Sequence, residues 1–282
     1  MIEAAPAKVN LALHLRRRRD DGYHDLETLF AFTDFGDRLS VQNHDGLALG
    51  IVGPLATAIT GTTDPLRAAS DTADNLVLRA ARALAAAAGI ERPTAAIVLD
   101  KHIPVAAGLG GGSADAAAAL RLLNRFWGLN WPLDRLAEIA ASLGADVPAC
   151  VHSRTMLGTG RGDALTPVDL DLAGKPVLLI NPRAAVPTGP VFAAWDRIDH
   201  GPLDPTGWQS ARNDLTTAAC KIAPVIVTVL AALDATGASF VRMSGSGATC
   251  LALYGDRAAC VAAEERIMLA HPDWWTTATV LR

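Results

Sequence analysis

Four glycines within the five positions 108–112 constrain this chain more than any other feature. Glycine loses more backbone freedom on folding than any other residue, so such a run is costly unless the chain needs unusual dihedral angles or a close backbone approach there. An alanine-rich run follows and predicts a helix from Ser113 to about Trp127. Because the free N–H groups at the start of a helix attract anions, this loop and helix predict a phosphate site.

The loop differs from two common nucleotide-binding motifs. No Gly-Lys-Ser or Gly-Lys-Thr closes it, so it is not a Walker A loop. A dinucleotide fingerprint fits poorly, because Ser113 stands where the third glycine belongs. A flexible turn that closes a helix-packed crossover remains the alternative to phosphate binding. We expect Ser113 to be the helix N-cap or a ligand to phosphate or magnesium.

Composition excludes several other classes of protein. Of 282 residues, 50 % are hydrophobic and 19 % charged, which is enough apolar surface for a sizeable core and excludes a disordered chain. Charges interrupt almost every apolar stretch, so we expect no membrane partner. A net charge of −4 gives no electrostatic reason to expect nucleic acid. The basic run 16–19 precedes two aspartates and is interpreted as a solvated hairpin loop, with a phosphate contact as the alternative.

The cysteines and the first residues indicate the compartment. The four cysteines form no CxxC pair and no zinc spacing, so we expect reduced thiols in or near the core. Lys8 and Asn10 interrupt the first apolar stretch, which argues against a secretory signal. Together these features predict a cytoplasmic protein.

Hydrophobic periodicity predicts an α+β chain of antiparallel strand runs with helices packed on one side. Turn signals are read at Gly22 and at Gly36-Asp37. The predicted strands are 9–15, 26–32, 39–42, 95–100, 176–180, 239–243, 250–253 and 276–281. The predicted helices are 74–88, 113–127, 132–144, 191–198, 224–235 and 258–270. We expect two domains, an N-terminal domain with the phosphate loop over residues 1–155 and a C-terminal domain over residues 156–282.

Three motifs resemble those of the galactokinase, homoserine kinase, mevalonate kinase and phosphomevalonate kinase superfamily. The segment 104–117 resembles its central phosphate-loop motif, 6–11 its first motif and 243–249 its third, in matching order across nearly the whole chain. The resemblance implies an ATP-dependent small-molecule kinase that also uses Mg2+. It implies a two-domain superfamily kinase fold, with a ribosomal-protein-S5-domain-2-like N-terminal domain, a ferredoxin-like C-terminal domain and an active site in the cleft between them.

Three further segments resemble one family, 4-diphosphocytidyl-2-C-methyl-D-erythritol kinase. They are DGYHDL at 21–26, LGADVP at 143–148 and PTGPVF at 187–192. The family phosphorylates the 2-position hydroxyl of a cytidine-diphosphate-linked sugar alcohol with ATP, in the non-mevalonate (methylerythritol phosphate) pathway to isoprenoids. Two alternatives stay open, namely another kinase of the superfamily, such as homoserine kinase, and a nucleotide-binding module without turnover.

The resemblance implies a catalytic pair, Lys8 and Asp146. Asp146 takes the proton of the acceptor hydroxyl, while Lys8 steadies Asp146 and the transferred phosphoryl group. A carboxylate beside a lysine stays ionised, because the opposite charge favours its anionic form. Without the family, Asp146 is interpreted as a turn-capping residue and Lys8 as a strand lysine whose ammonium reaches solvent.

The resemblance also implies contacts to the acceptor. Tyr23 and Phe192 sandwich the cytosine, and His24 reads its polar edge; stacking of this kind contributes about 1–3 kcal/mol per base. Asn10 and Thr188 contact the same substrate. Without the family, the two aromatic rings are ordinary packing residues and the histidine lies in a surface loop.

The implied ATP site comprises the loop and the start of the next helix. Its members are Pro104, Val105, Ala106, Ala107, Gly108, Leu109, Gly110, Gly111, Gly112, Ser113 and Ala114. Asn75 also approaches ATP by resemblance, with a simple N-cap as the alternative. We expect the turn 245–247 to prop the phosphate loop rather than to do chemistry. Asn213-Asp214 resembles a short turn of the family. Ala106-Ala107 stands where some relatives carry glycine, and we expect the two alanines to stiffen the entry of the loop.

Overall fold

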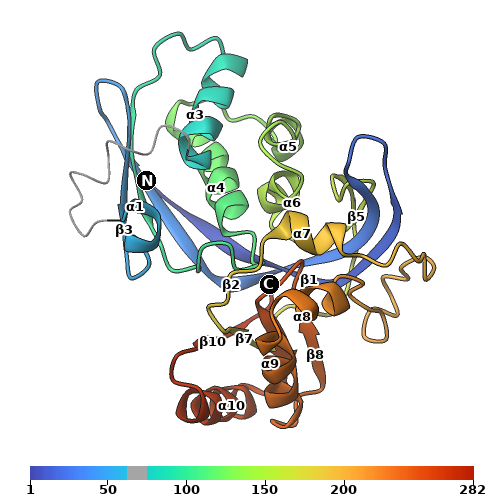
Figure 1. Ribbon diagram of the computed structural model, residues 1–282. Coiled ribbons are helices and arrows are strands. Elements are labelled where there is room, and N and C mark those ends of the chain that lie inside the picture. The colour runs from blue at the N-terminus through green and yellow to red at the C-terminus, as the bar shows by residue number, and fades with distance from the viewer. Residues whose placement is uncertain (62–74) are drawn as a thin grey trace. The chain divides into compact units, whose positions relative to one another are not determined.

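The computed structural model describes residues 1–61 and 75–282 (Figure 1). Their contacts divide the chain into two compact units. Unit 1 consists of Met1–Ala7, Gly36–Val105 and Gly110–Ser153, and unit 2 of Lys8–Phe35, Ala106–Leu109 and Arg154–Arg282. The last passage from unit 1 to unit 2 follows Ser153. The domain boundary expected at residue 155 stays a prediction.

Most predicted elements have a counterpart among the observed ones. The strands are β1 Ile2–Arg18, β2 His24–Gln42, β3 Leu47–Val52, β4 Ala95–Asp100, β5 Met156–Thr159, β6 Ala164–Pro167, β7 Pro176–Asn181, β8 Phe240–Met243, β9 Cys250–Leu253 and β10 Trp275–Val280. The helices are α1 Thr57–Thr60, α3 Leu76–Ala87, α4 Gly111–Phe126, α5 Leu133–Ala140, α6 Val147–His152, α7 Thr188–Ala193, α8 Thr216–Ile222, α9 Val225–Asp234 and α10 Arg257–Ala270.

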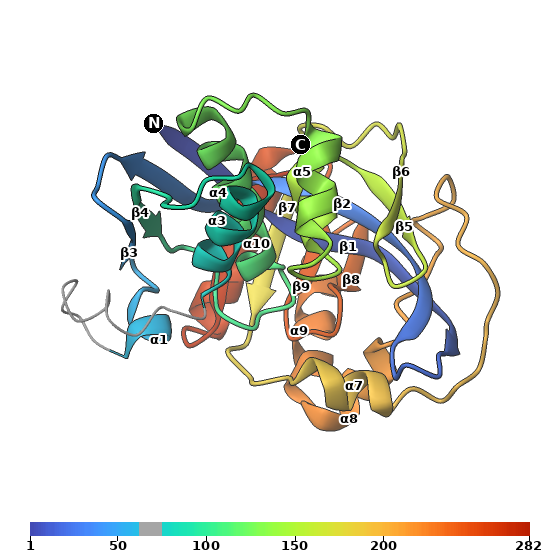
Figure 2. The same cartoon turned by 90° about the horizontal axis from the view of Figure 1, so that it is seen from above.

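In unit 1, strands pair on both sides of β4. β3 runs parallel to β4, from Leu47 opposite Ala95 to Val52 opposite Asp100. The end of β2, residues 38–42, pairs with β4 antiparallel. The parallel pair corrects the expectation of antiparallel runs, because the chain between β3 and β4 contains α3 and is long enough for the crossover that parallel strands need. α3 packs against α4 (Figure 2), and α5 and α6 pack against each other (Figure 1).

The turn predicted at Gly36-Asp37 is wrong, because β2 runs through both residues. A side chain at Gly36 would collide with the backbone carbonyl of Ala5 and would lie 2.7 Å from the Cα of Pro6. Glycine therefore serves a close approach between two backbones here, which is its other common use. Asp37 is buried rather than in a solvated turn.

Helix starts and ends also differ from the prediction. Gly110, with a positive φ of 62°, takes the N-cap position of α4, so Ser113 lies inside the first turn and the N-cap expectation for it is wrong. The helix expected over 132–144 ends at Ala140, and α6 begins separately with Pro148 in its first turn. α7 covers Thr188–Ala193 instead of 191–198; its N-cap is Pro187, and Pro190 lies in its first turn, where proline is tolerated. Arg197, with a positive φ of 66°, lies outside the helix. The expected helix start at Asp74 lies outside the described residues.

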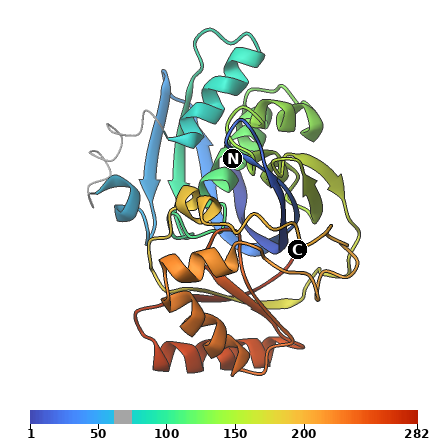
Figure 3. The same ribbon diagram turned by 45° about the vertical axis from the view of Figure 1, so that its right-hand side comes forward.

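Unit 2 contains a four-stranded antiparallel sheet in the order β10-β7-β9-β8. α9 precedes β8, and α10 connects β9 to β10, so the elements follow the βαββαβ pattern. This topology confirms the ferredoxin-like prediction for the C-terminal part. Both helices pack on this sheet (Figure 3). In the same unit, β5 pairs antiparallel with residues 28–30 of β2 and with β6.

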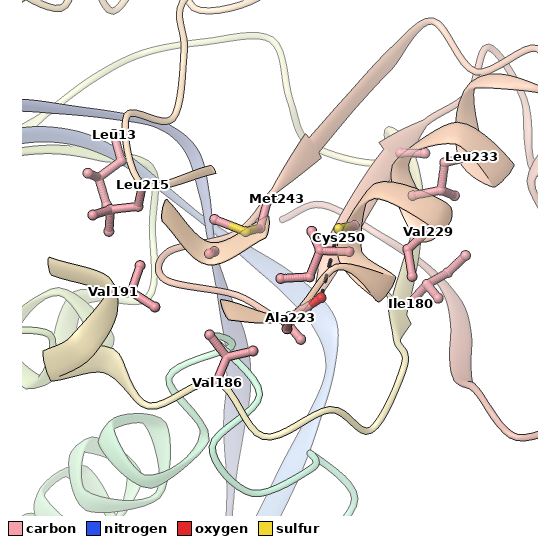
Figure 4. Packing of buried hydrophobic residues seen from close by; sticks show 14 of the residues in the cluster. Leu13, Ile180, Val186, Val191, Leu215, Ala223, Val229, Leu233, Met243 and Cys250 are labelled. Carbon is pink, nitrogen blue, oxygen red and sulfur yellow. Dashed lines mark hydrogen bonds between the residues drawn. The ribbon is translucent and has the colours of Figure 1, made fainter. Parts of the chain in front are cut away.

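The core of unit 2 joins these elements to β1. Figure 4 shows its side chains converging from β1, α7, α9 and the sheet; the labelled members include Leu13, Ile180, Val191, Leu215, Val229, Leu233 and Met243. In α9 the buried residues are Ile226, Val229 and Leu233, which recur at spacings of three and four and so share one face of the helix. Burial of side chains of this size contributes about 1.5–3 kcal/mol each. The strand that carries the site residues of β1 is thus held in place by this core.

Three further expectations concern the surface and the cysteines. Over residues 1–61 and 75–282, no helix combines the length and the apolar composition that crossing a membrane requires. All four cysteines are free, as expected; Cys220 is half-buried and the others are buried. The hairpin loop expected over 16–19 is wrong for its first three residues, because β1 continues through Arg18. The turn follows, and Arg19 pairs with Asp21 of the turn and with Asp25 of β2.

Candidate active site

In unit 1, the predicted ATP-binding residues surround the start of α4. The helix begins at Gly111, and its first free N–H groups belong to the glycine-rich segment. A side chain at Gly111 would lie 3.1 Å from the Lys101 ammonium and from the side chain of Ile103. Glycine at this position therefore lets the helix start pack closely on the segment that precedes the loop. Val105, at the entry of the loop, is 51 % exposed.

A buried charge cluster that the sequence analysis did not identify lies beneath this helix start. The Lys101 ammonium contacts Asp37 and lies 2.8 Å from Oδ2 of Asp115, and all three side chains are almost fully buried. Oδ1 of Asp37 also accepts the backbone N–H groups of His102 and Ile103. Burial raises the pKa of Asp115, and Lys101 opposes that shift. The cluster thus connects the segment before the loop to the first turns of α4.

In unit 2, loop residues 106–109 pack on the turn between β8 and β9. Gly108 has a positive φ of 77°, and a side chain there would lie 2.7 Å from the carbonyl oxygen of Gly247 and 2.8 Å from that of Ser244. The Thr249 N–H donates to the carbonyl of Ala107. These contacts agree with the expectation that the third motif props the phosphate loop. Ala106 adopts a positive φ of 53°.

Lys8 and Asn10 form a buried polar pair on β1. The Lys8 ammonium donates to Oδ1 of Asn10 at 2.9 Å, and it lies 5.3 Å from the centroid of the Phe30 ring. The amide nitrogen of Asn10 donates to Oγ1 of Thr28 at 2.7 Å, which fixes the orientation of the amide. The backbone N–H of Lys8 donates to the carbonyl of Leu109, so the strand contacts the phosphate loop. With 4 % exposure, Lys8 is not a strand lysine that reaches solvent.

Aromatic rings gather around His24, the first residue of β2. The His24 ring lies 5.2 Å from that of Phe192 and 5.7 Å from that of Trp195, between centroids. Burial, and then the charges of Arg18 and Arg197, lower the pKa of His24. The imidazole is therefore neutral at pH 7 and offers one donor and one acceptor.

Tyr23 lies at the surface beside this group. Its side chain is 55 % exposed, and the guanidinium of Arg161 lies 5.3 Å from its ring centroid. The cytosine sandwich expected between Tyr23 and Phe192 stays a prediction. An exposed ring next to a neutral histidine is compatible with it, since a base needs an uncovered π-face to stack on.

The remaining predicted residues lie at helix starts. Thr188 begins α7, and its hydroxyl lies 3.0 Å from that of Ser246. Asp146, in unit 1, is half-buried and precedes α6, where its carbonyl accepts the N–H of Cys150. Asn75 caps α3 through Oδ1, which accepts the N–H of Val77 at 2.9 Å. The N-cap alternative thus describes what this side chain does here, and its contact to ATP stays a prediction.

Sequence reasoning noted the Asn213-Asp214 turn and the third motif, which contains Ser244, but assigned no role to either side chain. It missed Lys101, Asp115 and Trp195 altogether. For two of the missed residues, the sequence contains a pattern that could have identified them. Trp195 follows Phe192 by three residues, a spacing that places side chains near each other in a helical turn. Asp115 is the one acidic residue of an alanine-rich helix, in which alanines follow it directly, and it therefore suggests a buried partner.

Candidate magnesium donors are few. Within residues 1–61 and 75–282, no group of three or more His, Cys, Asp or Glu side chains could hold a metal ion. Ser113, in the first turn of α4, remains a hydroxyl donor beside the phosphate loop. This is compatible with magnesium, which retains several waters and is commonly held by substrate phosphates and few protein ligands.

Comparison with known proteins gives consistent matches along the chain. Residues 75–154 match the GHMP kinases N terminal domain, and residues 208–267 match the GHMP kinases C terminal domain. A 4-diphosphocytidyl-2-C-methyl-D-erythritol kinase of Rhizorhabdus wittichii is 52 % identical, over 99 % of this chain and 94 % of its own. The protein of the same name from Novosphingobium aromaticivorans is 47 % identical, over 99 % of this chain and 92 % of its own.

Solved structures agree with these matches. The crystal structure of a 4-(cytidine 5'-diphospho)-2C-methyl-D-erythritol kinase is 33 % identical with a TM-score of 0.82, and it covers 100 % of this chain and 99 % of its own. A homoserine kinase from Cytophaga hutchinsonii has a TM-score of 0.73 at 18 % identity, over 99 % of this chain and 94 % of its own. At that identity the second likeness concerns the fold alone. The two-domain kinase fold expected from the motifs is confirmed.

Proposed function

Because this chain belongs to the 4-diphosphocytidyl-2-C-methyl-D-erythritol kinase family of the GHMP kinases, we propose that it transfers the γ-phosphoryl group of ATP to the 2-hydroxyl of that sugar alcohol. The bond between the γ-phosphorus and the β,γ-bridging oxygen breaks. A bond from the hydroxyl oxygen to the γ-phosphorus forms, and the hydroxyl proton leaves to a base. The products are ADP and a phosphomonoester on the non-mevalonate route to isoprenoids.

The observation that carries this proposal is the buried Lys8 beside the phosphate loop. Its ammonium is oriented by Asn10 at 2.9 Å, and its backbone N–H is bonded to Leu109 of the loop. Phosphoryl transfer depends chiefly on positioning and on neutralising the charge of the phosphate oxygens. A cation held at a loop of this kind supplies both functions.

Asp146 is the proposed general base. A carboxylate contributes typically 10²–10⁴-fold, as an order of magnitude, when it accepts a proton in the transition state. Its position directly before α6 keeps the side chain half-buried rather than in the core. Lys8 then stabilises the negative charge that builds on the transferred group.

The acceptor is selected through its cytosine. His24, neutral because its pKa is lowered, pairs with the polar edge of the base, while Tyr23 and Phe192 stack on its faces. Thr188 and Asn10 bind the sugar alcohol and its diphosphate. A site built on hydrogen bonds to one base rejects acceptors that lack them, because its own polar groups would stay unpaired.

The nucleotide binds at the glycine-rich loop, residues 104–114, with Asn75 near its base. The start of α4 faces the phosphates with N–H groups and the positive end of its dipole. Ser113, in the first turn of α4, is the proposed protein ligand of Mg2+, which would reduce the charge of the phosphate groups. An enzyme that consumes ATP works where ATP is maintained, so we also propose a cytoplasmic location.

Acceptor-dependent ADP release tests this function. The purified chain is assayed with ATP and Mg2+, and each of three acceptors is added separately: 4-diphosphocytidyl-2-C-methyl-D-erythritol, homoserine and mevalonate. We expect turnover with the first alone. Turnover with homoserine would indicate that the chain is another kinase of the superfamily. ATP binding without any acceptor-dependent release of ADP would support a nucleotide-binding module without turnover.

A further inference from the structure

One hydroxyl lies between the proposed nucleotide and acceptor sites of unit 2. Ser244, in the turn between β8 and β9, is fully buried. Its Oγ donates to the carbonyl of Gly108 at 3.0 Å and accepts the backbone N–H of Asn10 at 3.1 Å. Both of its neighbours are site residues, one in the phosphate loop and one on the acceptor strand.

The two partners of Ser244 are constrained in different ways. Asn10 is fixed by Lys8 at 2.9 Å and by Thr28 at 2.7 Å. Gly108 belongs to a loop in which Ala106 holds a positive φ of 53°. Alanine is disfavoured in this left-handed region, so the backbone of the loop is strained at Ala106.

Asn213 holds Ser244 in place from both sides. Its amide nitrogen donates to the carbonyls of Met243 and Gly245, each at 2.8 Å, while its Oδ1 accepts the N–H of Leu215. The next residue, Asp214, accepts the N–H of Leu15 on β1. The Asn213-Asp214 turn therefore fixes the third motif and the strand that carries Asn10 together.

We propose that Ser244 is a positioning residue that couples nucleotide binding to acceptor binding, an inference that rests on the proposed function. A phosphate group that orders the loop fixes the Gly108 carbonyl, and through Ser244 it fixes the backbone of Asn10. The second ligand then has less ordering entropy to lose, which is positive coupling between two sites. Such coupling typically changes an affinity about 5–150-fold, and it is reciprocal.

The test is the affinity of the acceptor with and without a non-hydrolysable ATP analogue and Mg2+, measured by titration calorimetry. In the wild type we expect the analogue to lower the acceptor Kd at least about fivefold. In Ser244→Ala the Kd values measured with and without the analogue become equal. Ser239→Ala is the control, because the Ser239 hydroxyl also donates to a backbone carbonyl, that of Leu253, but lies at the other end of β8. We expect this variant to keep the wild-type ratio of the two Kd values.

Ser244→Cys provides a second variant of nearly equal size, should the alanine variant fail to fold. A thiol is a weak donor and acceptor, so the ratio of the two Kd values falls between those of serine and alanine. A wild-type ratio in either Ser244 variant overturns the proposal, and so does a wild type without any coupling. Failure of the proposed function looks different, because the wild type then does not bind this acceptor at all.

Discussion

Replacing Gly108 with alanine tests how tightly the phosphate loop packs on the third motif. The new methyl group would lie 2.7 Å and 2.8 Å from the backbone oxygens of Gly247 and Ser244. Such distances do not occur between real atoms of this kind, and backbone carbonyls cannot rotate away as a flexible side chain can. The loop therefore has to move away from the turn that supports it.

Gly174→Ala separates this clash from the cost of the backbone conformation. Gly174 has φ of 78°, nearly equal to the 77° of Gly108, but a side chain there meets nothing within 4 Å. Both variants lose about 1–2 kcal/mol because alanine is disfavoured at positive φ. Gly108→Ala loses about 1–3 kcal/mol more, the typical cost of overpacking.

Urea unfolding and steady-state kinetics measure both effects. We predict that Gly108→Ala unfolds at a lower urea concentration than Gly174→Ala and has a raised KM for ATP, whereas Gly174→Ala keeps the wild-type KM. Equal loss of stability in the two variants, together with an unchanged KM, would refute the packing of residues 106–109 on residues 243–249.

Four further changes test other parts of the site and the core. Asp146→Ala should lower kcat by an order of 10²–10⁴ while ATP binding persists in calorimetry; a wild-type rate would contradict its role as base. Tyr23→Ala should weaken acceptor binding by about 1–3 kcal/mol, seen as a higher acceptor KM with little change in kcat, and an unchanged KM would exclude stacking. Asp37→Ala should cost about 3–5 kcal/mol in urea unfolding, because it breaks a buried ion pair, whereas Asp163→Ala, which breaks a partly exposed pair, should cost below about 1 kcal/mol. Burial, followed by the charge of Arg212, lowers the pKa of His14 below its ordinary 6.5, so the unfolded chain binds this proton at a higher pH and stability falls as pH drops below 6.5. His14→Gln should lose less stability over that pH range, and an equal loss in both proteins would contradict this assignment.

Local patterns predicted the elements that carry the site. The glycine run and the alanine-rich stretch gave a loop followed by a helix, and α4 begins two residues before the expected start. That difference arises because Gly110 adopts a positive φ at the N-cap. Any of the four glycines can adopt a positive φ, so the sequence does not show which of them begins the helix. Strand periodicity likewise predicted the part of β1 that carries Asn10, whereas Lys8 lies just before the predicted strand 9–15.

Contacts between distant segments could not be predicted from periodicity. Ser244 and Gly108 lie 136 residues apart, and Ser244 and Asn10 lie 234 apart. A serine in a glycine-rich turn is a common residue, and nothing in its neighbours along the chain indicates which backbone groups it meets. Gly36 illustrates the same limit, because a glycine that serves close backbone approach looks like a turn signal in the sequence.

Phosphorus NMR of the reaction product tests the proposed phosphoryl transfer most directly. The carbon that bears the 2-hydroxyl of 4-diphosphocytidyl-2-C-methyl-D-erythritol also bears the methyl group and no hydrogen. We predict a new phosphomonoester signal that remains a singlet in the proton-coupled spectrum, alongside ADP and an intact cytidyl diphosphate. A monoester signal split by neighbouring protons, or free phosphate as the sole new species, would contradict transfer to that hydroxyl.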